Sequence, residues 1–197
     1  MKKIINLLLF VIIVGAFSEC KKGENDPLLS TRTRKARVVG RWDVSEGKEN
    51  STYNYPGYSS STNIVYTKNS FAANYSYTFN NMTTAGSDVG AFACSLELEK
   101  DGSYLYTQSM DGVFLISKGT WNFTGKVGDL KNKEQIVLFQ TSSTQGSATI
   151  SYTGNEVFKT FNILELRNKL MVLTSENSMY ESNGQSEVSK VELTFEQ

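Results

Sequence analysis

The chain has 197 residues but no histidine and only two cysteines, which limits the chemistry that its side chains can do. Without histidine, neither a Ser-His-Asp nor a Cys-His nucleophile can form, and histidine-ligated zinc is excluded. A carboxylate pair such as Glu97 and Glu99 could still act as acid and base, but strand alternation would point both side chains to solvent. We therefore expect no catalytic residue, no metal ion and no cofactor. A carboxylate-based hydrolase is the remote alternative.

The two cysteines have different surroundings. Cys94 lies in the small apolar run Ala91–Leu96, which favours a buried core thiol over a nucleophile. Cys20 follows Met1-Lys2-Lys3 and an apolar run over residues 4–17. A charged start followed by about 7–15 apolar residues is typical of a secretory signal. The run is shorter than the roughly 20 residues of a membrane-spanning helix, so a short membrane anchor is the weaker alternative.

The segment that ends the apolar run, Phe17-Ser18-Glu19-Cys20, resembles the lipobox of bacterial lipoproteins. In that family the Cys is diacylated, palmitate being a typical acyl chain, and becomes the new N-terminus. Glu19 and Phe17 depart from the small residue and the Leu that the family prefers. The resemblance implies a signal peptide over residues 1–19 and a lipidated tether over 20–29. It also implies anchoring in a bacterial membrane through Cys20, the outer membrane being expected, with the domain facing the periplasm or the cell surface.

The charge of the mature chain excludes a broad class of partners. Residues 1–19 hold two lysines and one glutamate out of 20 basic and 20 acidic residues, so their removal leaves a net charge near −1. No global positive field would draw the protein to nucleic acid. With only Cys94 left after lipidation of Cys20, an intramolecular disulfide cannot form.

Most of the remaining chain predicts strands. Tyr75, Tyr77 and Phe79 alternate with polar residues, as do residues 96–99 and 191–196, and a period of two is the mark of a strand with one buried face. Turn pairs such as Asp101-Gly102 and Asp111-Gly112 separate successive runs. We expect strands near residues 41–46, 74–80, 94–100, 103–109, 113–123, 135–141, 147–153, 157–166, 170–176 and 187–196. An all-β, antiparallel up-and-down barrel of about 8–10 strands over residues 30–197 is the fold that this pattern favours.

Two segments depart from the strand pattern. Ser30 is predicted to cap a short helix over Thr31–Val39, whose four basic residues either meet membrane phosphates or form a solvated face. Residues 49–73 are rich in Ser and Tyr and too long for a plain connection. They are expected to be an insertion, either a lid over the barrel mouth or, slightly favoured, a disordered segment.

Gly40-Arg41-Trp42 follows the predicted helix and opens the first strand, and Gly119-Thr120-Trp121 recurs in mid-chain. These motifs resemble the Gly-x-Trp signature of the lipocalins, and of the divergent bacterial lipocalin-like lipoproteins in particular. The resemblance covers residues 30–197 and implies a barrel whose base is closed by a short helix, with the Trp packed beneath it. The Thr-Asp-Tyr motif of animal lipocalins is absent. Arg167 is the available candidate for the Arg that lipocalins stack on the Trp.

Several aromatic residues of the predicted strands could line a cavity or fill it. A barrel of eight strands is about wide enough to hold one small ligand. The leading hypothesis is therefore a membrane-anchored lipocalin-like protein that binds a small apolar or amphipathic ligand in the bacterial envelope. The alternative is a structural lipoprotein with a filled core that binds another envelope protein. The candidate ligand-binding residues are Tyr75, Tyr77, Phe79, Tyr104, Tyr106 and Phe114.

Overall fold

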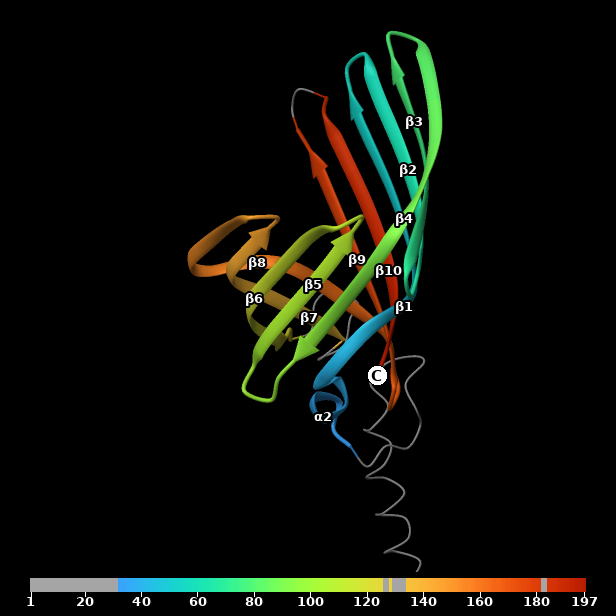
Figure 1. The fold of residues 1–197 in the computed structure, drawn as a ribbon. Helices are drawn as coiled ribbons and strands as arrows, with labels where there is room; N and C mark the ends of the chain where they lie inside the picture. Colours follow the sequence, from blue (N-terminus) through green and yellow to red (C-terminus); the bar gives the residue numbers. More distant parts are fainter. Residues whose placement is uncertain (1–31, 126–127, 129–133, 182–183) are drawn as a thin grey trace, which may run out of the picture.

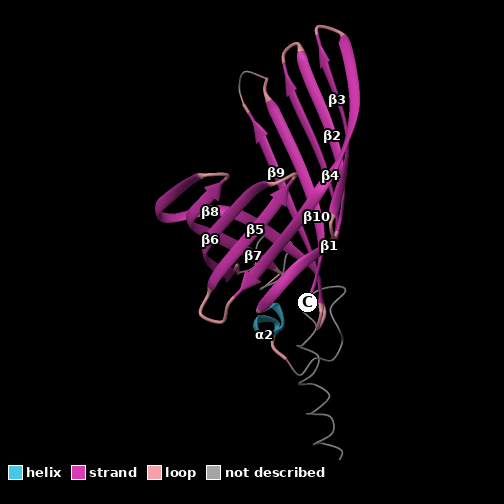
Figure 2. Cartoon of the chain, in the orientation of Figure 1, coloured by secondary structure: helices cyan, strands magenta, loops and turns pink. Residues whose placement is uncertain are grey.

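The computed structural model describes residues 32–125, 128, 134–181 and 184–197, and these form an all-β fold with one short helix (Figures 1 and 2). The proposed signal peptide, Cys20 and the Ser30 cap lie outside the described residues. Among the described residues, no helix is long and apolar enough to cross a membrane.

Ten antiparallel strands close into a barrel in the order β1-β10-β9-β8-β7-β6-β5-β4-β3-β2. Each strand pairs with its neighbours in sequence, and β1 closes the ring on β10, so the predicted up-and-down barrel is confirmed. The strands are β1 (Gly40–Tyr55), β2 (Tyr58–Thr67), β3 (Ser70–Phe79), β4 (Met82–Leu98), β5 (Ser103–Met110), β6 (Val113–Phe123), β7 (Gln135–Gln145), β8 (Ala148–Leu166), β9 (Leu170–Tyr180) and β10 (Ser186–Glu196).

A second pairing divides the barrel into a closed lower part, which we call the lower storey, and an upper part. The first residues of β1, Gly40–Asp43, pair with Ser95–Leu98 of β4, whereas β1 from Glu46 onward pairs with β2. The lower storey is therefore closed without β2 and β3 and has eight strands. Above it, β9, β10, β1, β2, β3 and the first half of β4 continue as a tall curved sheet (Figure 1). We call this upper part the extension.

The extension contains residues 49–73, for which the prediction from the sequence was wrong. Residues 49–73 are neither an insertion without regular structure nor a loop folded over the barrel, because they belong to β1, β2 and β3. The strand β2 was not predicted at all. Its Ser and Tyr residues carry little apolar area, but its backbone is hydrogen-bonded to β1 on one side and to β3 on the other. The two strands predicted over 147–153 and 157–166 form the single strand β8.

The core fills the lower storey. Trp42, Leu96, Leu98, Leu138 and Phe195 are at most 1% exposed, and they come from strands that alternate inward and outward residues. The indole nitrogen of Trp42 donates a hydrogen bond of 2.8 Å to the carbonyl of Val38. This places the first Gly-x-Trp motif at the base of the barrel.

The helix α2 (Arg34–Val38) lies under this base, as the resemblance implied, and begins later than predicted. Its N-cap is Thr33, whose hydroxyl accepts a hydrogen bond from the amide of Ala36 at 3.2 Å. Arg34 and Arg37 are buried, and Arg37 donates to the carbonyl of Leu166 on β8. Because both side chains are buried, they do not form the predicted solvated face, and Arg37 fastens the helix to β8.

The second motif, around Trp121, is also structural. Trp121 is buried, and its indole nitrogen donates to the carbonyl of Glu99 at 3.0 Å. Lys35 of α2 places its ammonium group 5.7 Å from the centre of the Trp121 ring. Arg167, the candidate for a stacked Arg, is exposed and forms a salt bridge with Glu165.

Candidate functional site

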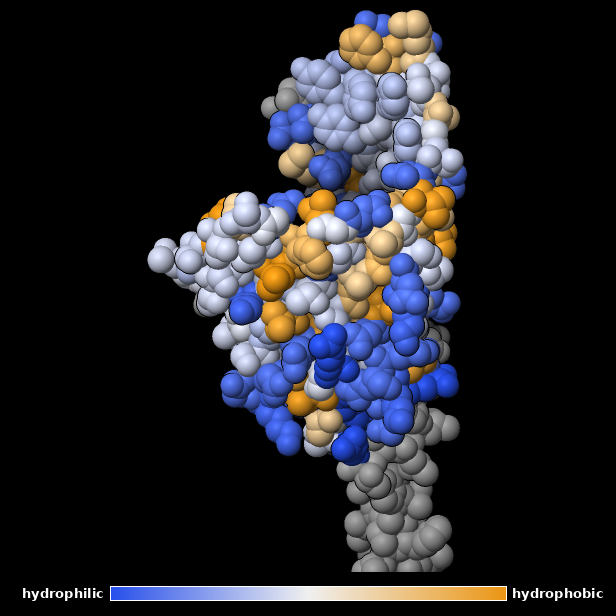
Figure 3. Space-filling view, viewed as in Figure 1, coloured by the Kyte–Doolittle hydropathy of each residue, from blue (hydrophilic) through white to orange (hydrophobic). Residues whose placement is uncertain are grey.

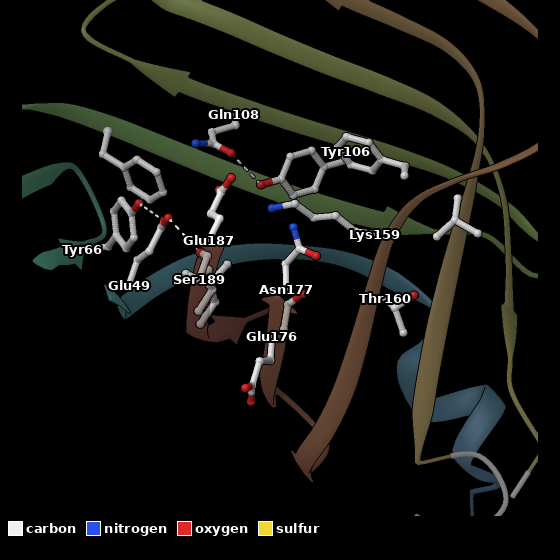
Figure 4. A pocket seen from close by; sticks show the side chains of 16 residues that line it. Glu49, Tyr66, Tyr106, Gln108, Lys159, Thr160, Glu176, Asn177, Glu187 and Ser189 are labelled. Atoms are coloured by element: carbon white, nitrogen blue, oxygen red, sulfur yellow. Dashed lines mark hydrogen bonds between the residues drawn. The ribbon is translucent and has the colours of Figure 1, made fainter. Parts of the chain in front are cut away.

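A cavity of about 610 Å³ lies where the closed lower storey opens into the extension. This volume is within the range of small-molecule sites, about 300–1,000 Å³. Its walls come from β1, β2, β4, β5, β8, β9 and β10. The lining residues include Glu49, Tyr66, Phe92, Tyr106, Gln108, Phe158, Lys159, Asn177, Glu187 and Ser189 (Figure 4).

Aromatic rings form the floor of the cavity. The rings of Tyr66 and Phe92 lie 4.4 Å apart, and Phe158 contacts Tyr106 at 5.4 Å between ring centres. Tyr66, Phe92 and Tyr106 are buried. The hydroxyl groups of the two tyrosines are not left unpaired, because Tyr66 donates to Glu49 at 2.8 Å and Tyr106 donates to Gln108 at 2.7 Å.

A β-bulge in β8 turns two consecutive side chains toward the interior. Leu138 of β7 pairs with Lys159, but the next residue, Phe139, pairs with Val157, so Phe158 is the extra residue. A bulge re-aims side chains in this way. The ring of Phe158 packs on Tyr106, and the ammonium group of Lys159 lies 5.4 Å from the centre of the same ring.

Lys159 is the cation of the cavity. It is partly buried, and burial lowers the pKa of its ammonium group. It forms no hydrogen bond or salt bridge with any residue in the part of the chain that the structure describes; its close neighbours are the aromatic rings of Tyr106 and Phe161. The negative charge of Glu49 partly offsets the effect of burial on this pKa. A partly desolvated cation without a hydrogen-bonded partner is still costly, and a ligand oxygen atom would supply that hydrogen bond.

Polar side chains converge around Lys159. Figure 4 shows the ends of Gln108 from β5, Lys159 from β8, Asn177 from β9 and Glu187 from β10 directed toward one another. Glu49 lies on a neighbouring wall of the cavity. Its carboxylate accepts hydrogen bonds from the hydroxyl groups of Tyr66 and, at 3.5 Å, Ser189. Amide, carboxylate and ammonium groups thus supply donors and acceptors above an aromatic floor.

Burial suppresses ionisation of the acidic groups beneath the cavity. The pKa of Tyr66 is raised by burial first and then by the negative charge of Glu49. Burial likewise raises the pKa of Tyr106. The thiol of Cys94 is buried, and burial raises its pKa to about 11. Cys94 is therefore a neutral core thiol at pH 7, as expected from the sequence, and not a thiolate nucleophile.

The structure separates the six predicted ligand-binding residues. Tyr106 lines the cavity. Tyr104 lies in the core, where its hydroxyl group and that of Ser117 are 2.7 Å apart. Phe114 is 55% exposed and lies at the start of β6, away from the cavity lining. Tyr75, Tyr77 and Phe79 lie on the extension, are 40–55% exposed, and do not line the cavity.

Sequence reasoning missed the polar residues of the cavity. One signal was present: Lys159, Phe161 and Ile163 alternate along β8, so Lys159 occupies an inward position. Glu49 was hidden in the segment expected to be an insertion. Asn177 and Glu187 lie on the β9–β10 hairpin, and Gln108 of β5 meets them only through the closure of the barrel. In the described part of the chain, no group of three His, Cys, Asp or Glu side chains could hold a metal ion.

Comparison with known proteins adds no family to these observations. No family model matches the chain, and no curated protein matches it. The likeness to lipocalins is therefore one of fold alone, a closed antiparallel barrel with a helix and a buried Trp at the base.

Proposed function

We propose that the protein is a lipocalin-like binding protein that holds a small amphipathic ligand in the cavity at the mouth of its barrel. The observation that carries this proposal is the open volume of about 610 Å³ with an aromatic floor and converging polar groups. The apolar part of the ligand packs on Tyr106 and Phe158. Its polar end, an oxygen acceptor, meets Lys159. A wholly apolar ligand fits less well, because Glu187 and Asn177 would lose water without gaining a partner.

In this proposal the protein binds its ligand without transforming it. The carboxylate pair considered from the sequence does not face the cavity: Glu97 lies outside the inward positions of Leu96 and Leu98, and Glu99 is exposed beyond the end of β4. Neither residue lines the cavity. The alternative, an interaction protein with a filled core, is supported only by the dense packing of the lower storey.

The proposal includes a lipid anchor on Cys20 in the bacterial envelope, with the outer membrane as the expected site. It is supported by the sequence of residues 1–20. A diacylated cysteine supplies the two acyl chains that stable anchoring takes. A Cys20→Ala variant should leave the membrane fraction as a soluble or uncleaved form. If the processed variant still sediments with membranes after a carbonate wash, the anchor is elsewhere.

Native mass spectrometry of the full chain, extracted from its own membrane in mild detergent, tests the cavity. The wild type should carry an additional bound mass, and Ser189→Phe, which fills the cavity, should lose it. Ser178→Phe is the matched control, because Ser178 is exposed on β9 and does not line the cavity. A wild type without bound mass, or a mass retained by Ser189→Phe, would count against the cavity as the binding site.

A further inference from the structure

In strands β1, β2, β3 and β4 the extension carries its aromatic residues on one face. Directly paired residues of antiparallel strands share a face, and the register gives three successive rows across β1, β2, β3 and β4. These rows hold six aromatic residues, and Tyr66 and Phe71 follow lower on the same face. The rows are Ser51-Thr62-Tyr75-Gly86, Tyr53-Ser60-Tyr77-Thr84 and Tyr55-Tyr58-Phe79-Met82. We call this face the tyrosine platform.

The opposite face of the same strands is different in kind. Between residues 50 and 63 and between residues 72 and 87 it carries Asn, Ser, Thr and Ala without a single aromatic ring. A sheet that needed aromatic residues only for strand propensity would not confine them to one side. The platform residues are also too exposed to be core, since Tyr75, Tyr77 and Phe79 keep 40%, 41% and 55% of their surface.

At least one ring of the platform lies flat. A Cβ atom at Gly86 would stand 2.6 Å from the Tyr75 hydroxyl oxygen and 2.7–2.9 Å from two of its ring carbons. The ring therefore rests against the backbone of β4 and turns its other side to solvent. Tyr53 and Tyr58 pack edge to face at 5.9 Å, which holds their rings in place.

Within β1, β2, β3 and β4 the platform carries hydroxyl groups but no charge, and Glu187 of β10, the partner of Tyr53, borders it. No position of the three rows is acidic or basic, and every row contains Ser, Thr or Tyr. In the view of Figure 3 the upper part of the extension is mostly pale, the colour of intermediate hydropathy, while deep blue gathers around the lower part of the barrel. Same-face residues of a strand lie about 6.8 Å apart, so Tyr75 and Tyr77 offer successive stacking positions.

We propose that the tyrosine platform binds a neutral glycan chain. A sugar ring has a C–H face that stacks on a flat aromatic ring, and hydroxyl groups at its edge that pair with Tyr, Ser and Thr hydroxyls. Successive stacking positions on β3 suit a chain of sugar units. The platform adjoins the cavity, since the row of Ser51 follows that of Glu49 along β1, but glycan binding does not depend on an occupied cavity.

Other occupants fit the platform less well. Single-stranded nucleic acid also stacks on aromatic rings, but it requires a positively charged groove, and the rows hold no Lys or Arg. A surface that binds an anionic membrane pairs apolar side chains with basic ones. A second copy of the chain would bring its own uncharged face against this one and leave many Tyr, Ser and Thr hydroxyls to be paired.

Isothermal titration of the full chain with neutral hexasaccharides tests the proposal, the probes being maltohexaose, cellohexaose, laminarihexaose, xylohexaose and mannohexaose. At least one should bind, more tightly than its monosaccharide, and its affinity should change little with salt because the ligand is neutral. Tyr75→Ser and Tyr77→Ser should each weaken binding about threefold to tenfold. The double variant should weaken it by about the product of the two effects.

Matched variants separate the platform from the cavity and from general exposure of aromatic rings. Phe114→Ser, on an exposed ring of the barrel, and Lys159→Met, in the cavity, should leave hexasaccharide affinity unchanged. Gly86→Ala keeps every tyrosine but displaces the ring of Tyr75, and should weaken binding as Tyr75→Ser does.

Three results would overturn the proposal. The first is that none of the hexasaccharides binds, and the second is that binding survives the Tyr75→Ser, Tyr77→Ser double variant. The third is that those tyrosines are instead required for binding to phosphatidylcholine vesicles or for self-association in sedimentation velocity. If the wild type binds a hexasaccharide but carries no bound mass that Ser189→Phe removes, that result would count against the cavity function alone.

Discussion

The lower storey and the extension share the strands β1, β4, β9 and β10 but follow opposite rules. In the lower storey, inward residues such as Trp42, Leu98 and Phe195 are fully buried, and the ring of eight strands is closed. In the extension, β1 and β4 continue upward together with β2 and β3, and the inward face of this sheet carries half-exposed aromatic residues such as Tyr75 and Tyr77 of β3. Backbone pairing alone can therefore extend a sheet beyond its core, whereas the burial of side chains determines which part of the sheet is stable. The lower storey stabilises the fold, and the side chains of the extension and of the cavity below it are available to bind ligands.

The largest expected effect comes from the base of the barrel. Trp42→Ala should lower the free energy of unfolding by about 3–5 kcal/mol, because Trp42 is fully buried and hydrogen-bonded to Val38. Urea unfolding followed by far-ultraviolet circular dichroism measures it. A loss below about 1 kcal/mol would show that the lower storey is not the stabilising part.

Two glycines give the next comparison. A Cβ atom at Gly119 would stand 1.9 Å from the carbonyl oxygen of Phe139, which is backbone and cannot turn aside. Gly119→Ala should therefore destabilise the protein by about 3 kcal/mol. Gly86→Ala meets only the movable side chain of Tyr75 and should cost about 0.5 kcal/mol. Equal losses in the two variants would contradict the division into scaffold and platform.

Alkaline pH should weaken the junction between the two storeys. The pKa of Cys94 is raised by burial from 9.0 to about 11, so the neutral thiol stabilises the fold below pH 9, and this contribution is lost as pH rises toward 11. The loss should be about 2 kcal/mol. Urea midpoints at pH 8, 9, 10 and 11 measure it. Cys94→Ala should flatten this part of the curve, leaving only the later contributions of Tyr66 and Tyr106, and an unchanged curve would show that Cys94 is not its source.

Lys159 should behave as a functional rather than a stabilising residue. Lys159→Met keeps the packing of the aliphatic stem on Tyr106 and removes a partly desolvated charge, so the free energy of unfolding should stay within about 1 kcal/mol of the wild type or rise. The same variant should lose the mass bound in native mass spectrometry. Marked destabilisation with the bound mass retained would assign Lys159 to the scaffold.

The smallest effect is expected on the platform. Tyr77→Ser removes a ring that is 41% exposed and should change the free energy of unfolding by about 0.5 kcal/mol or less. Tyr106→Ser, on a ring that is 1% exposed, serves as the contrast and should cost about 3–5 kcal/mol. Comparable losses in the two variants, measured by thermal unfolding, would show that the platform is part of the core.

The antiparallel barrel could be predicted from the sequence alone. Alternation in residues 94–109 and 191–196, with Gly-containing turns between strands, predicts antiparallel neighbours because each local signal agrees with the next. The Gly40-Arg41-Trp42 motif and the preceding basic segment indicated how the base is closed. The exclusion of histidine chemistry also follows from composition alone.

The boundary between the lower storey and the extension could be seen only in the tertiary structure. Residues 49–73 have the composition of a disordered segment, and they form strands because β10 and β3 offer backbone partners that no local pattern records. The cavity has the same origin, since Gln108 of β5 meets the residues of the consecutive strands β8, β9 and β10 only when the sheet closes. The bulge at Phe158 is set by the pairing of β8 with β7. Sequence periodicity fixes which face of a strand a residue takes, but the register between distant strands fixes which residues it meets.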